Sequence, residues 1–211
     1  MKIRIAKVTF WISSSLLLLL LSVQVVTTDV YLLAHVDRYD SHRLVTWDHE
    51  HALREISAYL NGQRDDLEFA STPGGTDVVM SERGLLHMID VANLYAAGRG
   101  LAALFTVLAA VAGVTLYDAK KLKETLQKQW IFPTAFAAFI TAAMVIDFSA
   151  AFRLFHELFF TNDLWLLSAL DPLIIMLPST FFFITGATII GLFITAHGIL
   201  HLFAVKTKLQ F

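Results

Sequence analysis

The sequence contains no cysteine among its 211 residues. A disulfide-stabilised domain, a thiolate metal site and a catalytic cysteine are therefore excluded. Charged residues are also scarce, at 16%, whereas hydrophobic residues make up 56% of the chain. A water-soluble domain of this length carries more charge on its surface. The net charge of -2 provides no basic surface for nucleic acid, so we expect no nucleic-acid partner.

The signatures of several enzyme classes are missing as well. The chain has no G-x-S-x-G, no H-E-x-x-H, no P-loop and no dinucleotide fingerprint. These absences disfavour a serine acyl-enzyme, a zinc hydrolase and an ATP-driven transporter, and we expect no cofactor and no metal in the active site. The H-x-x-x-x-D spacing of glycerolipid acyltransferases occurs from His35 to Asp40. No phosphate-binding segment follows it, so we interpret this match as a coincidence.

The hydrophobic residues are concentrated in four runs, at about residues 8–26, 97–117, 130–152 and 179–205. Each run is long enough to cross the ~30 Å hydrocarbon core of a bilayer as a helix. The first run is interpreted as a retained anchor and not a signal peptide, because it is long and no clear cleavage site follows it. The sequence therefore predicts an all-α polytopic membrane protein with four transmembrane helices and a small extracytoplasmic cap.

The lysines give the direction of these spans. All of them lie near the chain ends or in the short segment 118–129 between the second and third runs. Because lysine and arginine are enriched in cytoplasmic loops, we expect both termini and this loop to be cytoplasmic. The predicted organisation is a first transmembrane helix at 1–27, an extracytoplasmic cap at 28–96, and three further spans at 97–211 with an outer re-entrant or interfacial segment at 153–178.

The predicted cap shows helical patterning. Apolar residues recur at helical spacing through residues 49–59, and Asn61-Gly62 is a pair that ends a helix readily. A turn is expected at 71–76, with room for a strand pair nearby. Ser81 is a predicted N-cap for a helix that continues into the second span. Beyond the third span, residues 164–178 are apolar but too short to cross, and Asp171-Pro172 interrupts them.

Ionisable residues at membrane depth are costly and are therefore candidates for function. His87 and Asp90 lie one helical turn apart before the second span. Near the outer end of the third span, Asp147 is followed on the same predicted helix by Arg153, His156 and Glu157. Two histidines thus approach the outer interface from different helices. A lone interfacial histidine is more often an ordinary hydrogen-bonded residue, and Arg153 with Glu157 fits an i,i+4 ion pair, so position alone indicates only a candidate.

Two other histidine groups have simpler explanations. His42, His49 and His51 offer imidazoles for copper or zinc, which suggests a non-catalytic membrane sensor or metal-binding protein as an alternative function. Histidines grouped in this way are more commonly the polar residues at the start of a helix. His197 and His201 lie one turn apart near the predicted cytoplasmic end of the fourth span, and we interpret them as a buried or interfacial polar pair.

Two stretches resemble the lipoprotein intramolecular transacylases (Lit). The first is Tyr59-Leu-Asn61 followed by Ser81-Glu-Arg83 and His87-Met-Ile-Asp90-Val. The second is Phe155-His156-x-x-Phe159-Phe160-x-x-Asp163-x-Trp165, then Asp171-Pro-Leu-Ile, Pro178 and Phe181-Phe182. The chain departs from the family pattern at Ala92, where a lysine is usual, and at Leu167-Ser168, where a second Asp-Pro pair is usual. Neither departure involves a histidine.

The resemblance implies four spans under an extracellular cap in a bacterial plasma membrane. It also implies an acyltransferase whose substrate is a diacylglyceryl lipoprotein in the membrane lipid. Such an enzyme moves the sn-2 acyl chain from the glycerol oxygen to the amine of the N-terminal cysteine and gives the lyso form. By their motifs, His87 and His156 match the family's catalytic histidines.

The candidate residues suit this chemistry on their own terms. Histidine exchanges protons near neutral pH, and an intramolecular transfer needs no acyl-enzyme nucleophile. Arg153 is a candidate to hold a carbonyl, Asp90 or Asp147 to orient an imidazole, and the aromatic side chains to wall a water-excluding pocket. The full set of candidate substrate-binding residues is Tyr59, Asn61, Asp90, Asp147, Arg153, Phe155, Phe159, Phe160, Trp165 and Asp171. The residues do not decide which histidine is the base.

Overall fold

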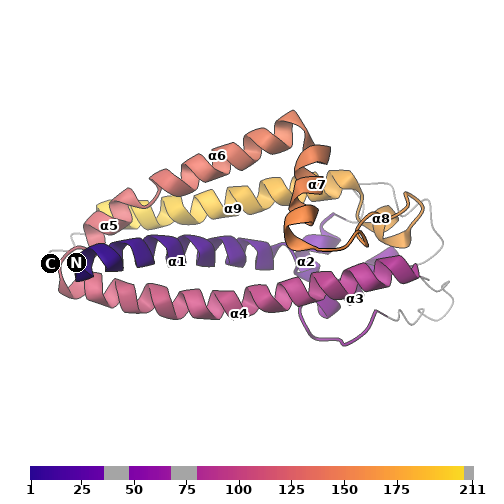
Figure 1. Cartoon of the computed structure of the whole chain (residues 1–211), viewed down its shortest axis with the longest axis horizontal. Helices are drawn as coiled ribbons and strands as arrows, with labels where there is room; N and C mark the ends of the chain where they lie inside the picture. The colour runs from indigo at the N-terminus through magenta and orange to yellow at the C-terminus, as the bar shows by residue number, and fades with distance from the viewer. Residues whose placement is uncertain (36–47, 68–79, 207–211) are drawn as a thin grey trace. The chain divides into compact units, whose positions relative to one another are not determined.

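The computed structural model describes residues 1–35, 48–67 and 80–206, which are helices and connecting turns without a strand (Figure 1). The strand pair considered above is thus absent from the described residues, and the expected turn at 71–76 lies outside them. The chain divides into two compact units. Unit 1 comprises Met1–Val23, Gly98–Ile146 and Ala187–Phe211, and unit 2 comprises Gln24–Ala97 and Asp147–Gly186.

Four helical segments are long and apolar enough to cross a membrane. They are α1 (Lys2–Val25), α4 (Glu82–Asp118), the segment Leu122–Ile146 that contains α5 (Leu122–Lys128) and α6 (Ile131–Ile146), and α9 (Ser179–Lys206). Many of their apolar side chains are exposed, such as Val107 at 60% and Phe139 at 69%. Side chains of this kind suit contact with lipid, in which apolar exposure carries no penalty. The predicted all-α membrane fold with four spans is confirmed.

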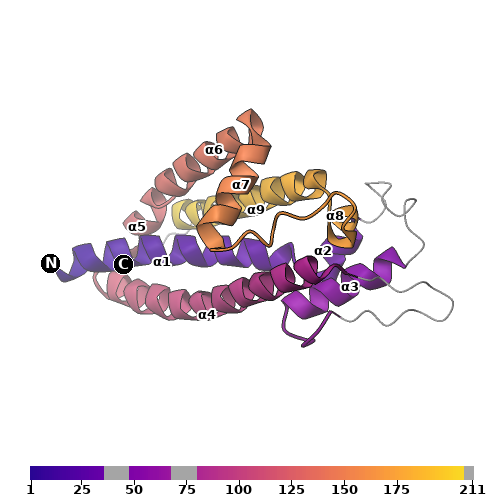
Figure 2. The same cartoon turned by 45° about the vertical axis from the view of Figure 1, so that its right-hand side comes forward.

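Helix α1 makes polar contacts with two other helices of unit 1, and it lies between α4 and α9 in both views (Figures 1 and 2). The indole nitrogen of Trp11 donates to the carbonyl of Thr125 at 3.0 Å, and the hydroxyl of Ser15 lies 3.2 Å from Nε2 of His197. The ring of Phe10 packs against Gly113 of α4. Small and hydroxyl-bearing residues at these contacts allow close helix packing where lipid offers no hydrophobic driving force.

The third predicted span, 130–152, is not one continuous helix. Helix α6 ends at Ile146, and Asp147 has extended backbone angles and caps a separate helix, α7 (Phe148–Phe159). Its carboxylate accepts a hydrogen bond from the backbone N–H of Ala150 at 2.9 Å. An aspartate competes with the helix backbone for such bonds and is favoured at an N-cap over a helix interior. The expectation that Asp147 lies inside a continuous third span that runs on toward His156 is therefore wrong.

Unit 2 is built around one apolar core that gathers three short helices and the starts of two long ones. The short helices are α2 (Asp29–Leu33), α3 (His49–Leu60) and α8 (Pro172–Met176). The buried members of the core are Leu32, Ala52, Leu53, Ile56, Leu60, Leu67, Met80, Met88, Leu173, Met176, Leu177 and Phe181. The amphipathic helix predicted at 49–59 is confirmed, and its Ile56 is fully buried. Burial of one such side chain contributes about 1.5–3 kcal/mol.

Helix α3 ends where the sequence predicts. Gly62 adopts a positive φ of 72°, and Asn61 is the C-cap. The Asn61 amide donates to the carbonyls of Thr27 and Ser57 at 3.0 and 2.9 Å, and its oxygen accepts from Gln24. Asn61 therefore ties the end of α3 to the turn that follows α1.

The apolar segment 164–178 is organised by Asp171, which begins α8 with Pro172 at its first position. One carboxylate oxygen accepts from the N–H of Leu173 at 3.0 Å, and the other accepts from the hydroxyl of Ser81. Ser81 in turn accepts from the N–H of Gly84 at 2.9 Å, which confirms it as the N-cap of α4. The starts of α4 and α8 therefore share one chain of hydrogen bonds.

Gly84 lies close to the hydrogen bonds of Ser81 and Asp171. Its substitution to alanine therefore tests how much these bonds stabilise the protein. An added Cβ would lie 3.1 Å from the Ser81 hydroxyl and 3.3 Å from the Asp171 carboxylate, which are held by their own bonds. We expect Gly84→Ala to destabilise the protein by about 1–3 kcal/mol, as overpacking does, against an alanine gain of about 1 kcal/mol. Thermal unfolding in detergent measures this loss of stability. Gly100→Ala, on the same helix with nothing within 4 Å, is the control and should not destabilise. Equal melting temperatures for the two variants would contradict the prediction.

Candidate active site

One face of α4 carries three polar residues at its start. Arg83, His87 and Asp90 are spaced by four and three residues, which places them in line on a helix. His87 is buried, with 7% of its surface exposed, whereas Arg83 and Asp90 on either side of it are only partly buried. The structure thus presents an imidazole between a cation and a carboxylate on a single helix face.

His156 meets His87 from α7. The two ring centroids are 5.9 Å apart with an interplanar angle of 39°, and His156 is also 7% exposed. Phe160 contacts both rings, with centroid distances of 5.2 Å to His87 and 5.7 Å to His156. Two residues separated by 69 positions in the sequence are therefore brought into one buried pair.

The hydrogen bonding of His156 fixes its tautomer. Nδ1 lies 2.7 Å from the carbonyl oxygen of Phe152, which can only accept, so Nδ1 carries the hydrogen. In the neutral ring Nε2 then holds the lone pair. Burial lowers the pKa of His156 below its ordinary value of 6.5, and the bond to Phe152 offsets this only in part. His156 is therefore a neutral imidazole with an available basic nitrogen at neutral pH.

His87 differs from His156 in its bonding. Its Nδ1 is buried and has no hydrogen-bond partner among the described residues. A buried polar atom without a partner is uncommon in folded proteins and is found at functional sites. The unpaired nitrogen therefore marks His87 as a candidate functional residue.

Aromatic rings surround His156 on several sides. Phe152 and Trp165 lie closest, with centroid distances of 4.2 and 4.8 Å, and Phe155 lies at 5.4 Å. Phe155 and Phe159 pack on each other at 4.8 Å and are 46% and 53% exposed. Of the predicted aromatic residues, Phe155, Phe160 and Trp165 contact the His156 ring directly. Phe152 belongs to this group as well and was missed, although its place one turn before His156 is a visible signal.

The segment between α7 and Leu167, here called the 161–166 loop, is held by Arg83 and Asp90. The Arg83 guanidinium donates to the carbonyls of Leu166, at 3.2 Å, and Asp163, and it pairs with the Asp163 carboxylate at 3.0 Å. Asp90 accepts from the side-chain amide of Asn162 at 2.8 Å. Arg83 and Asn162 were not among the predicted site residues. The in-line spacing of Arg83 with His87 was a signal for the first, and no sequence signal indicates the second.

Several predicted substrate-binding residues have other contacts. Asp147 and Asp171 act as helix caps, and Asn61 closes α3. Tyr59 packs against the apolar core of unit 2. Arg153 is exposed, and within the described residues it forms no ion pair with Glu157, so the i,i+4 pair considered above is not made.

The remaining histidines lie apart from this pair in their contacts. His49 and His51 begin α3, where Asp48 accepts from the N–H of His51 at 2.9 Å. His42 and Asp40 lie outside the described residues, and the described part of the chain contains no group of three metal-binding side chains. In unit 1, His197 is 1% exposed, and Nδ1 of His201 lies 3.2 Å from the carbonyl of Gln127. The predicted buried polar pair on α9 agrees with these contacts.

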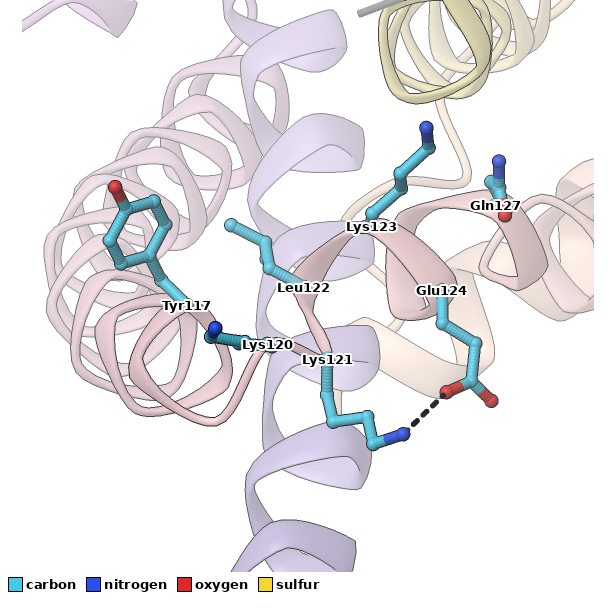
Figure 3. A pocket seen from close by; sticks show the side chains of 7 residues that line it. All are labelled: Tyr117, Lys120, Lys121, Leu122, Lys123, Glu124 and Gln127. Carbon is cyan, nitrogen blue, oxygen red and sulfur yellow. Dashed lines mark ion pairs between the residues drawn. The ribbon is translucent and has the colours of Figure 1, made fainter. Parts of the chain in front are cut away.

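Unit 1 also contains a cavity of about 260 Å³ at the turn between α4 and α5 (Figure 3). Its lining residues are Tyr117, Lys120, Lys121, Leu122, Lys123, Glu124 and Gln127. Figure 3 shows Lys121 directed toward Glu124 and Lys123 directed away from it, so the amines do not converge on one point. The cavity contains no histidine, and it belongs to a different unit from His87 and His156.

Comparisons with known proteins identify the family. The family model described as lipoprotein intramolecular transacylase Lit matches residues 8–182. The fold is similar to an in meso structure of the membrane-integral transacylase Lit from Bacillus cereus, with a TM-score of 0.83, 22% identity, and coverage of 97% of this chain and 96% of that one.

Two further structures of the Bacillus cereus protein carry a histidine-to-arginine or histidine-to-alanine substitution. They match with TM-scores of 0.78 and 0.79 at 23% and 22% identity, covering 97% and 96% of this chain and 92% of each of theirs. A comparison with curated proteins gave no match. The family model spans most of the chain, and the chain therefore belongs to the lipoprotein intramolecular transacylase Lit family, as an acyltransferase of the bacterial membrane.

Proposed function

We propose that the protein moves the sn-2 acyl chain of a diacylglyceryl lipoprotein from the glycerol oxygen to the α-amine of the N-terminal cysteine. One observation carries the proposal: two buried imidazoles lie 5.9 Å apart, and one of them has a fixed tautomer with a free basic nitrogen. The absence of cysteine and of a serine-nucleophile motif is consistent with a transfer that needs no acyl-enzyme.

The reaction is an attack within one molecule. It closes a ring through the acyl carbon, the ester oxygen, two glycerol carbons, sulfur, Cβ, Cα and nitrogen. A flexible chain rarely adopts such a shape, so holding it supplies up to about 7–11 kcal/mol in the best systems. Phe155, Phe160 and Trp165 are proposed to hold the folded head group, with the exposed ring of Phe159 extending the same surface toward the acyl chains.

The two histidines are proposed to have different roles. Nε2 of His156 takes the amine proton as nitrogen bonds to the acyl carbon, and it returns that proton to the glycerol oxygen as the carbon–oxygen bond breaks. Because His87 is buried, it stays neutral and donates a hydrogen bond to the tetrahedral oxyanion. The fixed tautomer of His156 favours it as the base, and the unpaired nitrogen of His87 favours it as the partner of a substrate oxygen. Arg153, exposed about one turn before His156, is proposed to contact a substrate carbonyl.

We further propose that the site faces outward and that both termini are cytoplasmic. The lysines of α1 and of the α4–α5 turn support this orientation, because Lys7 pairs with Glu124 at 3.2 Å and so joins these two stretches at one end of unit 1. Lipoproteins expose their modified cysteine at the outer surface in this scheme. The extracytoplasmic cap proposed for residues 28–96 would then receive the substrate.

The product of the reaction tests the proposed function directly. A diacylglyceryl lipopeptide incubated with the purified protein should keep its mass while one acyl chain becomes amide-linked to the cysteine. Tandem mass spectrometry after mild base treatment, which cleaves esters and spares the amide, measures this. Loss of one acyl chain as free fatty acid would identify a lipase instead, and an unchanged lipopeptide would contradict the proposal.

Substitution of either histidine should lower turnover strongly. We expect His87→Ala and His156→Ala each to reduce the rate of amide formation by about 10²–10⁴-fold, the range for general acid–base groups and oxyanion donors. His156→Asn separates chemistry from folding, because its amide can still donate to the Phe152 carbonyl but offers no basic nitrogen. His51→Ala, on α3, is the matched control and should keep nearly full activity. Near-normal turnover by either alanine variant would contradict the assigned roles.

The lowered pKa of His156 predicts the acid side of the pH profile. Since burial lowers this pKa below 6.5, the neutral base persists below that pH and is lost only as pH falls through the lowered value. We expect the acid limb of kcat to have its midpoint below pH 6.5. Protonation also favours the unfolded chain, so the melting temperature should fall as pH drops below 6.5. The substrate amine has its own pKa of about 7.7–8.0, so its limb of the kcat profile is separated from that of His156 by repeating the measurement with a lipopeptide of altered amine pKa. A remaining histidine midpoint above 6.5 would contradict a buried neutral His156 as the base.

A further inference from the structure

The 161–166 loop is attached to α4 on both sides of His87. Arg83 lies one turn before His87 and holds the carbonyls of Asp163 and Leu166. Asp90 lies one turn after it and holds Asn162. Because the anchors and the histidine share one helix face, the loop is fixed relative to the imidazole they flank.

The loop places Trp165 over His156. The side-chain oxygen of Asn162 accepts from the N–H of Leu164 at 3.1 Å. The backbone carbonyl of Asn162 accepts from the indole nitrogen of Trp165 at 3.1 Å. The indole ring then lies on the imidazole with an interplanar angle of 31° and a centroid distance of 4.8 Å. The polar atom of the indole is occupied within the loop, so its apolar face is what meets the base.

This placement bears on which acceptor reaches the ester. The same base that takes a proton from the cysteine amine can take one from water. In the first case nitrogen bonds to the acyl carbon and the glycerol oxygen leaves with a proton. In the second case water oxygen forms that bond, and a fatty acid and a lyso-lipopeptide result. Exclusion of water from a closed site is a recognised way to prevent such hydrolysis.

We propose that the 161–166 loop, held by Arg83 and by the bond from its own Asn162 to Asp90, selects the amine over water as the acyl acceptor by keeping Trp165 on His156. This inference rests on the proposed transacylase function. Arg83 and Asn162 are positioning residues in this scheme, because they fix the loop and do not touch the reacting atoms. The Arg83–Asp163 pair is solvent-exposed, with side-chain exposures of 40% and 74%, so its loss costs little stability.

The experiment measures two products from one diacylglyceryl lipopeptide, the amide-linked isomer and free fatty acid. The variants are Arg83→Gln, Asn162→Ala and Trp165→Phe, with Arg54→Gln as the matched control. Arg54 is an exposed arginine of the same unit that pairs with Glu50 at 2.6 Å and with Asp29 at 3.4 Å, both outside the loop. Arg83→Lys keeps the charge but cannot reproduce the forked donation to two carbonyls, so it should fall between wild type and Arg83→Gln.

For Arg83→Gln and Asn162→Ala we expect the ratio of hydrolysis to transfer to rise about tenfold or more, since misplacement by about 1 Å can cost 10²-fold in an oriented reaction. Trp165→Phe should raise the ratio less, because a ring remains over His156. Arg54→Gln should keep the wild-type ratio.

The outcomes separate the two proposals. A parallel fall of both products with an unchanged ratio would show a merely structural role and overturn the inference. An unchanged rate and ratio in Arg83→Gln would also overturn it. If the wild-type protein forms no amide-linked product, the proposed function itself fails.

Discussion

Five helices that begin in unit 2 start where a side chain accepts a hydrogen bond from a free backbone N–H, and the positions of His87 and His156 depend on two of these starts. Thr28, Asp48, Ser81, Asp147 and Asp171 perform this task for α2, α3, α4, α7 and α8. In apolar surroundings an unpaired N–H costs more than in water, so the position of each cap determines where a helix starts. The distance along the helix from its cap determines the direction in which each histidine side chain points. His87 lies six residues after Ser81, and His156 lies nine after Asp147.

The break at Asp147 is the most consequential of these starts. Because Asp147 ends α6 and begins α7, His156 belongs to a separate helix. His156 then reaches the Arg83–His87–Asp90 face of α4, which belongs to the same unit. A single carboxylate that might have been costly at membrane depth is therefore used at a helix start, where its charge also suits the helix dipole.

The sequence predicts the features that depend on local patterns. Run length and hydropathy give the spans, the 3.6-residue period gives α3, and Ser81 and Gly62 mark helix ends. The features that it does not predict depend on partners far along the chain. Asp171 receives its bond from Ser81, 90 residues away, and Asn162 reaches Asp90 across 72 residues. Such contacts have no local period or spacing, so neither the bond between Ser81 and Asp171 nor the position of Asn162 beside Asp90 was predicted.

The prediction that Asp147 lies inside a continuous span was wrong for a different reason. The local surroundings of Asp147, a long apolar run before it and the short run 148–152 after it, are the same for a carboxylate in a continuous span and for one at a helix start. Hydropathy averages over such a site and cannot distinguish the two. Capping preference does distinguish them, because aspartate is a strong N-cap and a poor interior helix residue. Weighing that preference above run length gives the observed break.

An intramolecular transacylase has a selectivity problem that an acyl-enzyme does not share. No covalent intermediate holds the acyl chain, so the cysteine amine and water compete for the same ester throughout the reaction. Orientation can decide this competition, because effective molarities in well-oriented reactions reach about 10⁵–10⁸ M and so exceed the concentration of bulk water. Base strength cannot decide it, since one imidazole serves either acceptor. Under the proposed function, the aromatic rings around His156, and the loop that holds Trp165 among them, are therefore as necessary to the reaction as the two histidines.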